Sequence, residues 1–285
     1  MKIVGLGKAG CNIANVFAKF PQYETHTIDT HNEAEIVIKK RENHEDYDAL
    51  FPDLKKKLKF TDEEICVITC GSGQISGGIL RLLDHLQGNE VRVVYIQPDL
   101  TLLSETQKMQ ERVVRNVLQE YARSGLLKMV YLVDNTAIEK SIGDISIVGY
   151  YETLNQAVVN TLHMINVFEN SEPVIGNFTT PADISRIATV GVVNLEDEEE
   201  EENWFYALTN VRDVVYYYGI GHEDLKNDGT LFRKINDFVK SKIDDNVNIS
   251  YGVFETGYEQ KYCYCIKYSS MVQSYGELLD DQDIS

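Results

Sequence analysis

Short, almost wholly apolar segments alternate with longer amphipathic stretches through the first half of this 285-residue chain. The apolar segments predict strands at residues 2–5, 24–30, 65–70, 91–97 and 128–133. Helix-like spacing of apolar residues predicts helices at 12–20, 78–86 and 105–124. Strands that alternate with helices form βαβ units, and continuous apolar strands are typical of a parallel sheet covered on both faces. The first half therefore predicts a Rossmann-like α/β domain.

A long predicted helix at 155–168 separates this half from a region of different texture. Strands are predicted at 190–195, 213–218, 247–254 and 261–269, with a helix at 231–243. Tyr216, Tyr217 and Tyr218 should alternate across their strand, with two rings on one face and one on the other. We expect four parts: a sheet domain at 1–150, a connecting helix at 151–171, a smaller α+β domain at 172–270 and an acidic tail at 271–285.

Charge and composition exclude several classes of partner. The chain carries 45 acidic and 27 basic residues, a net charge of −18, which argues against direct contact with nucleic acid or anionic lipid. Acidic runs at 196–202 and 280–283 are expected to be solvated. No apolar run approaches the ~20 residues of a membrane span, so no membrane insertion is expected. Met1 is expected to begin a cytoplasmic chain without a signal peptide.

The five cysteines show no paired CxxC motifs, which argues against a disulfide framework and against a zinc site. No metal-ligating residues are predicted.

The first glycine loop, residues 5–10 (GLGKAG), follows a predicted strand and opens a helix. Glycines at this place let backbone N–H groups approach a phosphate at a helix N-terminus. The GxGxxG spacing also fits a dinucleotide-binding fold, in which Asp29, at the end of the second strand, would bind a ribose. A glycine turn without any ligand is the third interpretation.

The second glycine loop, residues 71–78 (GSGQISGG), follows the third strand and again opens a helix. A dinucleotide fold does not require glycines at this point. A bound triphosphate explains these glycines, because a second helix N-terminus can hold the far end of the triphosphate. The pair of loops therefore favours a nucleoside triphosphate.

In these segments the chain resembles the tubulin/FtsZ superfamily. Residues 5–12 (GLGKAGCN) are similar to its first nucleotide loop, and residues 69–78 (TCGSGQISGG) stand where it carries a GGGTGTG-type signature. Further similar segments are 133–135 (VDN), 182–186 (ADISR) and 218–268, with Tyr151 and Asn155 at the start of the central helix. The resemblance covers nearly the whole chain and depends on the order of these motifs.

The resemblance implies a GTP or GDP site with Mg²⁺ at the carboxyl edge of the sheet. The residues implied for nucleotide contact, with Asp29 carried along from the dinucleotide interpretation, are Gly7, Lys8, Gly10, Cys11, Asn12, Asp29, Gly71, Gly73, Ser76, Gly77, Gly78, Glu105, Lys108, Asn135, Tyr151 and Asn155. Among these, Tyr151 would stack on guanine, Asn135 and Asn155 would contact it, and Glu105 and Lys108 would lie near the ribose.

Hydrolysis, by the same resemblance, needs a second copy whose loop after the central helix reaches the nucleotide. Asp183 stands at the later acidic position of that loop, and Thr180 stands where an earlier Asp is usual. A threonine hydrogen-bonds water but does not accept its proton as a carboxylate does. Asp183 has a structural alternative as the N-cap of a following helix that contains Ile184 and Ile187.

Two residues of the second loop depart from the family pattern and bear on function. Gln74 and Ile75 replace glycines, and a β-branched residue disfavours positive φ, so the second loop is expected to follow an altered path.

The sequence leaves three hypotheses for the function of the chain. The chain is a GTP-binding cytoskeletal protein that assembles head to tail with itself, with an adaptor or cargo protein as a further partner. Alternatively it is a structural relative that has lost hydrolysis or binding, or a dinucleotide-dependent enzyme.

Overall fold

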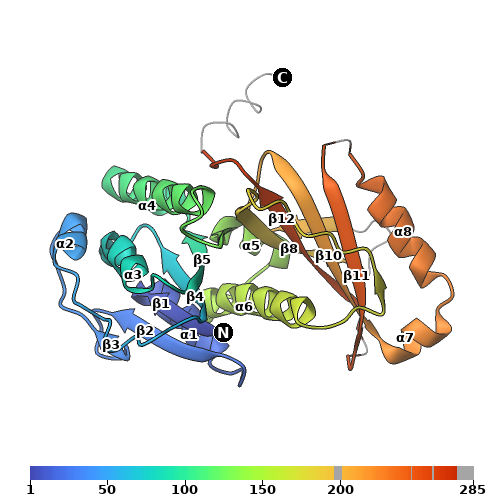
Figure 1. Cartoon of the computed structure of the whole chain (residues 1–285), viewed down its shortest axis with the longest axis horizontal. Coiled ribbons are helices and arrows are strands. Elements are labelled where there is room, and N and C mark those ends of the chain that lie inside the picture. Colours follow the sequence, from blue (N-terminus) through green and yellow to red (C-terminus); the bar gives the residue numbers. More distant parts are fainter. Residues whose placement is uncertain (196–200, 245, 259, 275–285) are drawn as a thin grey trace.

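A computed structural model describes residues 1–195, 201–244, 246–258 and 260–274. One twelve-stranded sheet runs through it, in the order β3-β2-β1-β4-β5-β6-β8-β12-β10-β11-β7, and β9 pairs with β8 (Figure 1). The predicted α/β class is confirmed, because the sheet is mostly parallel and is packed against helices.

The first half supplies the parallel part of the sheet. Its strands are β1 (Lys2–Leu6), β2 (Glu24–Asp29), β3 (Ile36–Val37), β4 (Glu64–Cys70), β5 (Glu90–Gln97) and β6 (Met129–Asp134). Every neighbouring pair among them is parallel. The five strands predicted here are confirmed to within a residue or two, because each is a short apolar run between polar turns.

The second half continues the sheet with β7 (Ile175–Gly176), β8 (Ile187–Asn194), β9 (Glu201–Trp204), β10 (Val211–Gly221), β11 (Asn248–Thr256) and β12 (Tyr262–Ser269). β8 joins β6 in parallel, whereas β12 is antiparallel to both β8 and β10. β10 and β11 are parallel, and α7 (His222–Asn227) and α8 (Leu231–Ser241) connect them. The sheet is continuous across the predicted domain boundary, so the four-part division stays a prediction.

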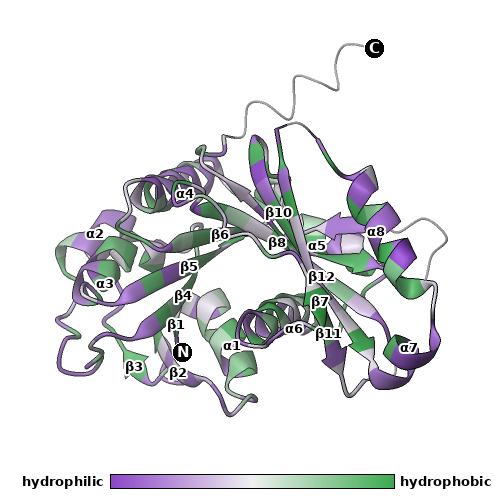
Figure 2. Cartoon of the chain, turned by 45° about the vertical axis from the view of Figure 1, so that its right-hand side comes forward, coloured by the Kyte–Doolittle hydropathy of each residue, from purple (hydrophilic) through white to green (hydrophobic). Residues whose placement is uncertain are grey.

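Helices cover both faces of the sheet (Figures 1 and 2). Buried side chains of α1 (Gly7–Phe17) and α6 (Tyr150–Glu169) share one core with both halves. On the other face, α3 (Ile79–His85) and α4 (Glu105–Arg123) cover the first half and α8 covers the second. Tyr217 lies in the first core, whereas Tyr216 and Tyr218 lie in the core beneath α8, which confirms the predicted alternation.

Several predicted helix boundaries require correction. The helix expected at 12–20 begins five residues earlier, at Gly7, so the residues 7–10 belong to its first turns. The helix expected at 78–86 is preceded by a 3₁₀ turn, η1 (Gln74–Gly78). The short helices α2 (His44–Ala49) and α5 (Asn135–Ile142) were not predicted, because a helix of two turns has too few residues to show a clear apolar period.

The alternative role of Asp183 as a helix N-cap is wrong. Asp183 and Ile184 form a turn, and the next element is strand β8, which begins at Ile187. Within the described residues, no helix is both long and apolar enough to cross a membrane. The acidic residues 196–200 and 280–283 lie outside the described part of the chain.

The two ends of the parallel strands define two edges that matter below. The carboxyl edge is where β1, β4, β5 and β6 end, and α1, η1 and α5 begin there. The amino edge is where these strands start. The central helix α6 reaches from one edge to the other: it begins beside α5, and its last residue, Glu169, forms an ion pair with Arg92 near the start of β5 (3.4 Å).

Candidate functional site

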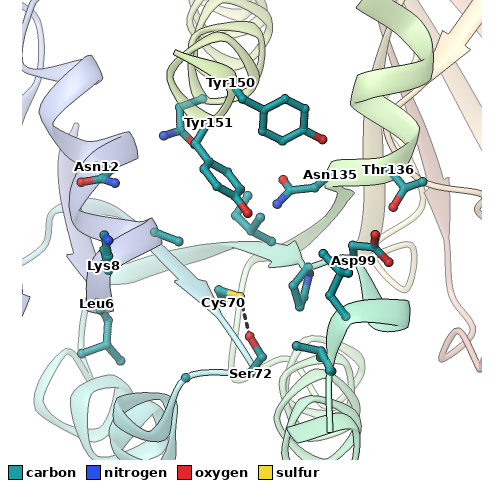
Figure 3. A pocket seen from close by; sticks show the side chains of 18 of the residues that line it. Leu6, Lys8, Asn12, Cys70, Ser72, Asp99, Asn135, Thr136, Tyr150 and Tyr151 are labelled. Carbon is teal, nitrogen blue, oxygen red and sulfur yellow. Dashed lines mark hydrogen bonds between the residues drawn. The ribbon is translucent and has the colours of Figure 1, made fainter. Parts of the chain in front are cut away.

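A cavity of about 720 Å³ opens at the carboxyl edge of the sheet (Figure 3). That volume lies in the range of roughly 300–1,000 Å³ that is typical of small-molecule sites. Its lining consists of Leu6, Gly7, Lys8, Ala9, Asn12, Cys70, Ser72, Gly73, Ile75, Ile96, Pro98, Asp99, Leu102, Leu103, Asn135, Thr136, Glu139, Tyr150, Tyr151 and Asn155.

The start of α1 forms one wall. Gly7 adopts a left-handed backbone (φ +74°), which turns the chain from β1 directly into the helix. In the described part of the chain no side chain caps this N-terminus, so the first-turn N–H groups are left for another acceptor. Lys8 is exposed and is the only basic side chain among the described residues of the lining. This wall therefore combines free N–H groups with a positive charge, as an anion-binding site does.

Gly10 serves packing and does not line the cavity. A β-carbon at Gly10 would lie 2.3 Å from the backbone oxygen of Ile68 on β4. The glycine therefore lets α1 cross β1 and β4 at close range. Cys11, next to it, is buried against the carbonyl oxygens of Gly5 and Ile28, and burial raises the pKa of its thiol to about 12.

The second glycine loop forms the adjacent wall, and its polar side chains are engaged within the protein. The Ser76 hydroxyl is buried beside the carbonyl oxygens of Gly71 (2.9 Å) and Gly73 (2.6 Å). The Gln74 amide donates to the Glu42 carbonyl oxygen (2.7 Å), and Ser72 Oγ lies 3.4 Å from Cys70 Sγ. Burial raises the pKa of the Cys70 thiol, so this group is protonated at neutral pH.

The segment around α2 holds this loop from behind. His44 Nε2 lies 3.3 Å from Ser76 Oγ, and a β-carbon on Gly77 would lie 2.0 Å from the His44 carbonyl oxygen. A β-carbon on Gly78 would in turn collide with the Phe51 ring, at 2.4 Å. Gly77 and Gly78 are therefore needed where α2 packs on η1, and neither lines the cavity.

The wall across the cavity is formed by α5 and α6. Figure 3 shows the Tyr151 ring and the Asn135 side chain on the opposite side of the cavity from Ser72. Tyr150 donates a hydrogen bond to Glu139 (2.8 Å), and burial together with this bond raises the pKa of Tyr150 to about 12. The N-terminus of α5 differs from that of α1, because the Asp134 carboxylate caps it by accepting from the Thr136 N–H (2.8 Å).

Residues 98–103 close the remaining side, and the sequence did not single them out. The turn η2 (Leu100–Leu102) follows β5. Leu102 lines the cavity from this turn, and Pro98, Asp99 and Leu103 line it from the flanking positions. Their signal was their position: a segment that directly follows a parallel strand lies at the carboxyl edge. Thr136, Glu139 and Tyr150 were missed as well, although they adjoin the predicted Asn135 and Tyr151.

The predicted nucleotide-contacting residues divide into two groups. Those that line the cavity are Gly7, Lys8, Asn12, Gly73, Asn135, Tyr151 and Asn155. Those that do not are Gly10, Cys11, Asp29, Gly71, Ser76, Gly77, Gly78, Glu105 and Lys108. Asp29 is buried, accepts from the Thr30 N–H (2.6 Å) and is not among the residues that line the cavity, where a ribose-binding acid would be expected. Lys108 and Glu105 pair with each other at 2.8 Å.

Thr180 and Asp183 lie at the amino edge, away from this cavity. Both are exposed in the loop that leads into β8, whose first residue, Ile187, pairs in parallel with Val130 near the start of β6. Arg186 connects this loop to the residues before β6 by donating a hydrogen bond to the Leu127 carbonyl oxygen (3.3 Å). One copy of the chain therefore does not bring Thr180 and Asp183 to its own cavity.

Comparison with solved structures shows the same architecture. A GTPγS-form protofilament of TubZ from Bacillus thuringiensis serovar israelensis matches with a TM-score of 0.72 and 18% identity, over 95% of this chain and 87% of that one. An empty FtsZ dimer (M. jannaschii) matches with a TM-score of 0.68 and 12% identity, over 94% and 87%. A helical model of the TubZ-Bt two-stranded filament gives 0.69 and 16%, over 99% and 89%.

Sequence comparison adds nothing to this likeness. No protein-family model matches the chain, and no curated protein matches it. At 12–18% identity the structural matches establish the fold alone. They confirm, at that level, the resemblance drawn from the glycine loops and the order of the later motifs. The chain therefore has the tubulin/FtsZ fold.

Proposed function

We infer that the chain binds a guanine nucleotide in the cavity at its carboxyl edge and assembles head to tail with copies of itself. One observation carries the inference: an uncapped helix N-terminus with Lys8 faces, across a single cavity, an aromatic ring flanked by amides. The first wall suits phosphates, and the second suits a flat base with hydrogen-bonding edges. The structural matches to TubZ and FtsZ support the same choice.

The two walls of the cavity support one orientation of the nucleotide. Phosphates would lie at α1, because its uncapped N-terminus carries Lys8, the basic side chain of the described lining. They do not belong at α5, where the Asp134 carboxylate already occupies the N-terminus. The base then lies against Tyr151, with Asn135 and Asn155 placed to donate to and accept from its edge.

Magnesium would accompany the phosphates without a protein cage. Among the described residues there is no cluster of three or more His, Cys, Asp or Glu side chains that could hold a metal ion. A Mg²⁺ ion commonly relies on phosphate oxygens and water with only one or two carboxylates. The Asp99 carboxylate of the lining accepts from Thr101 and lies near Tyr150 and Asp134, at the other wall, so phosphate oxygens and water would hold the ion.

The two edges of the sheet support head-to-tail assembly. At the carboxyl edge, Ile147 and Val148 are 94% and 89% exposed beside the cavity mouth. At the amino edge, Leu126 and Ile184 are 67% and 64% exposed. Their loops contact each other, since Arg186 donates to Leu127. Different patches at opposite ends of one molecule suit a heterologous contact that repeats into a filament.

In this arrangement the amino edge of one copy would cover the nucleotide of the next. Thr180 and Asp183 would then face the phosphates, where Asp183 would orient water and accept its proton and Thr180 would only hydrogen-bond it. The division of the chain into a nucleotide-binding part (1–150), a central helix (151–171) and an assembly part (172–270) is proposed on the same basis, as are a cytoplasmic setting and an adaptor or cargo protein.

The nucleotide is tested by thermal unfolding with GDP, GTP, ADP and NAD⁺, in buffer that contains Mg²⁺. A ligand at a hundred times its dissociation constant stabilises the fold by about 2.7 kcal/mol. We expect this for the guanine nucleotides alone. Replacing Lys8 by Ala removes a charge-assisted contact of about 1.5–3 kcal/mol, so affinity should fall tenfold or more. Lys19→Ala, just beyond the other end of α1, is the matched control. Stabilisation by NAD⁺ alone would contradict the proposal.

Assembly is tested by sedimentation and electron microscopy with bound nucleotide. The double substitution Ile147→Lys, Val148→Lys should abolish filaments and leave nucleotide affinity intact, because neither residue lines the cavity. Val113→Lys is the matched control, since Val113 is 53% exposed in the middle of α4, away from both edges. Filaments that survive the double substitution would contradict the proposed contact.

A further inference from the structure

We propose that Ile75 limits the number of phosphates that the site accepts, so that the chain holds a nucleoside diphosphate in preference to the triphosphate. This inference rests on the proposed nucleotide function and specifies its ligand. It starts from a contact between the two glycine loops. A β-carbon on Gly7 would lie 2.8 Å from Ile75 Cγ2, so this methyl group covers the first residue of α1.

Ile75 is held in that position by the fold. It lies in η1, is partly buried against the core beneath α3, and at the same time lines the cavity. Its methyl group stands where the N-termini of α1 and η1 converge. The phosphates of a bound nucleotide would start at the first-turn N–H groups of α1 and continue toward η1. There they would contact this apolar group.

The polar side chains of the second loop offer a terminal phosphate no additional hydrogen-bond donor. All three of its polar side chains have partners within the protein: Ser72 at Cys70, Gln74 at Glu42 and Ser76 at Gly71 and Gly73. A terminal phosphate beside Ile75 would lose hydration and gain no side-chain donor from this loop. Desolvating a charged oxygen without a new hydrogen bond is strongly unfavourable.

The charged side chains of the cavity lining also disfavour a third phosphate. Of the described residues that line the cavity, Lys8 alone is basic; the acidic ones, Asp99 and Glu139, lie beside Tyr150 at the other wall. Each added phosphate brings further negative charge to a site with one compensating cation. The first-turn N–H groups of α1 and Lys8 can serve a diphosphate, whereas a third phosphate would find Mg²⁺ and backbone N–H groups of η1 but no second basic side chain in the described lining.

The test is the relative affinity of the full chain for GMP, GDP and GTP at one fixed Mg²⁺ concentration, measured by calorimetry. We expect the wild-type chain to bind GDP about tenfold more tightly than GTP, a difference of about 1.4 kcal/mol. Ile75→Ala removes the methyl group over Gly7 and should shift this ratio about tenfold toward GTP. Ile75→Val keeps a γ-methyl group on a branched β-carbon and should retain the wild-type ratio.

Leu102→Ala separates this effect from a general loss of contact. Leu102 lines the other side of the cavity, and its removal should change the affinities for all three nucleotides by one common factor. Equal or tighter binding of GTP by the wild-type chain overturns the inference without any variant. An unchanged ratio in Ile75→Ala, in protein whose unliganded melting temperature shows that it is folded, overturns it as well. Both results leave the nucleotide site standing, whereas failure of every guanine nucleotide to bind overturns site and inference together.

Discussion

The first glycine loop (residues 5–10) and the second (residues 71–78) have similar composition, but their glycines approach different neighbours. In the first loop, Gly10 lets α1 pack on the backbone of β4, and Gly7 turns the chain so that the helix N-terminus opens into the cavity. In the second loop, Gly77 and Gly78 face α2, on the side away from the cavity.

The difference shows what a glycine-rich turn does and does not indicate. It indicates that something comes close to the backbone, because a β-carbon would collide there. It does not identify the neighbour, which is a strand for Gly10 and a short helix for Gly77. Of the second loop, Gly73 and Ser72 reach the cavity together with the branched side chain of Ile75. The two loops therefore offer unequal support to a ligand.

The largest effect is expected from Gly10→Ala. Its β-carbon would lie 2.3 Å from a backbone oxygen of the central sheet, which cannot shift without disturbing β4. We expect a loss of about 3 kcal/mol in the free energy of unfolding, the upper end for overpacking, measured in urea. Gly73→Ala is the matched control. Its backbone is extended (φ −83°), and no atom of the described residues beyond its chain neighbours lies within 4 Å of an added β-carbon. The change should stay below about 1 kcal/mol. Equal effects would remove the distinction between packed and open glycines.

A smaller effect is expected from Gly77→Ala. The clash is with the His44 carbonyl oxygen, at 2.0 Å, but α2 is a short peripheral helix that can move away. We expect a loss of about 1 kcal/mol, at the low end for overpacking, and faster hydrogen exchange of the α2 amides, with the exchange of β4 unchanged. Faster exchange in β4 would show that the second loop is built into the core as firmly as the first.

The smallest effect is a pH dependence of stability that comes from His44, which contacts the second loop. Burial lowers the pKa of His44, which contacts Ser76. Because its folded-state pKa lies below the unfolded value, the unfolded chain binds more protons. The contribution of His44 to stability is therefore full above pH 6.5 and is lost as pH falls toward the folded-state pKa.

His44→Gln should reduce the slope of stability against pH below pH 6.5 and leave stability at pH 8 nearly unchanged. Part of the slope should remain, since burial also lowers the pKa of His163, which stacks on Phe20. Urea unfolding at several pH values measures it. An undiminished slope in His44→Gln would show that this histidine does not couple α2 to the loop.

Much of the fold was predictable because its strands are simple apolar runs. The parallel strands β1, β4, β5 and β6 were predicted nearly to the residue, and so was the buried alternation of Tyr216–Tyr218. The parallel pairing of β10 with β11 was not, because pairing depends on which strands meet and not on local composition. Local composition also left two interpretations open for Asp183. The turn before β8 contains the polar and apolar residues that a helix start would have.

Local sequence patterns were enough to specify a parallel α/β sheet with glycine loops after its first and third strands, because apolar period and glycine spacing are local properties. Which residues face the cavity depends on how distant segments pack together. Ile75 lies over Gly7 while Ser76, its neighbour, is turned inward, because α2 packs on η1 from a distant part of the sequence. Close approach between remote segments is set by packing of the whole core, and no local pattern encodes it.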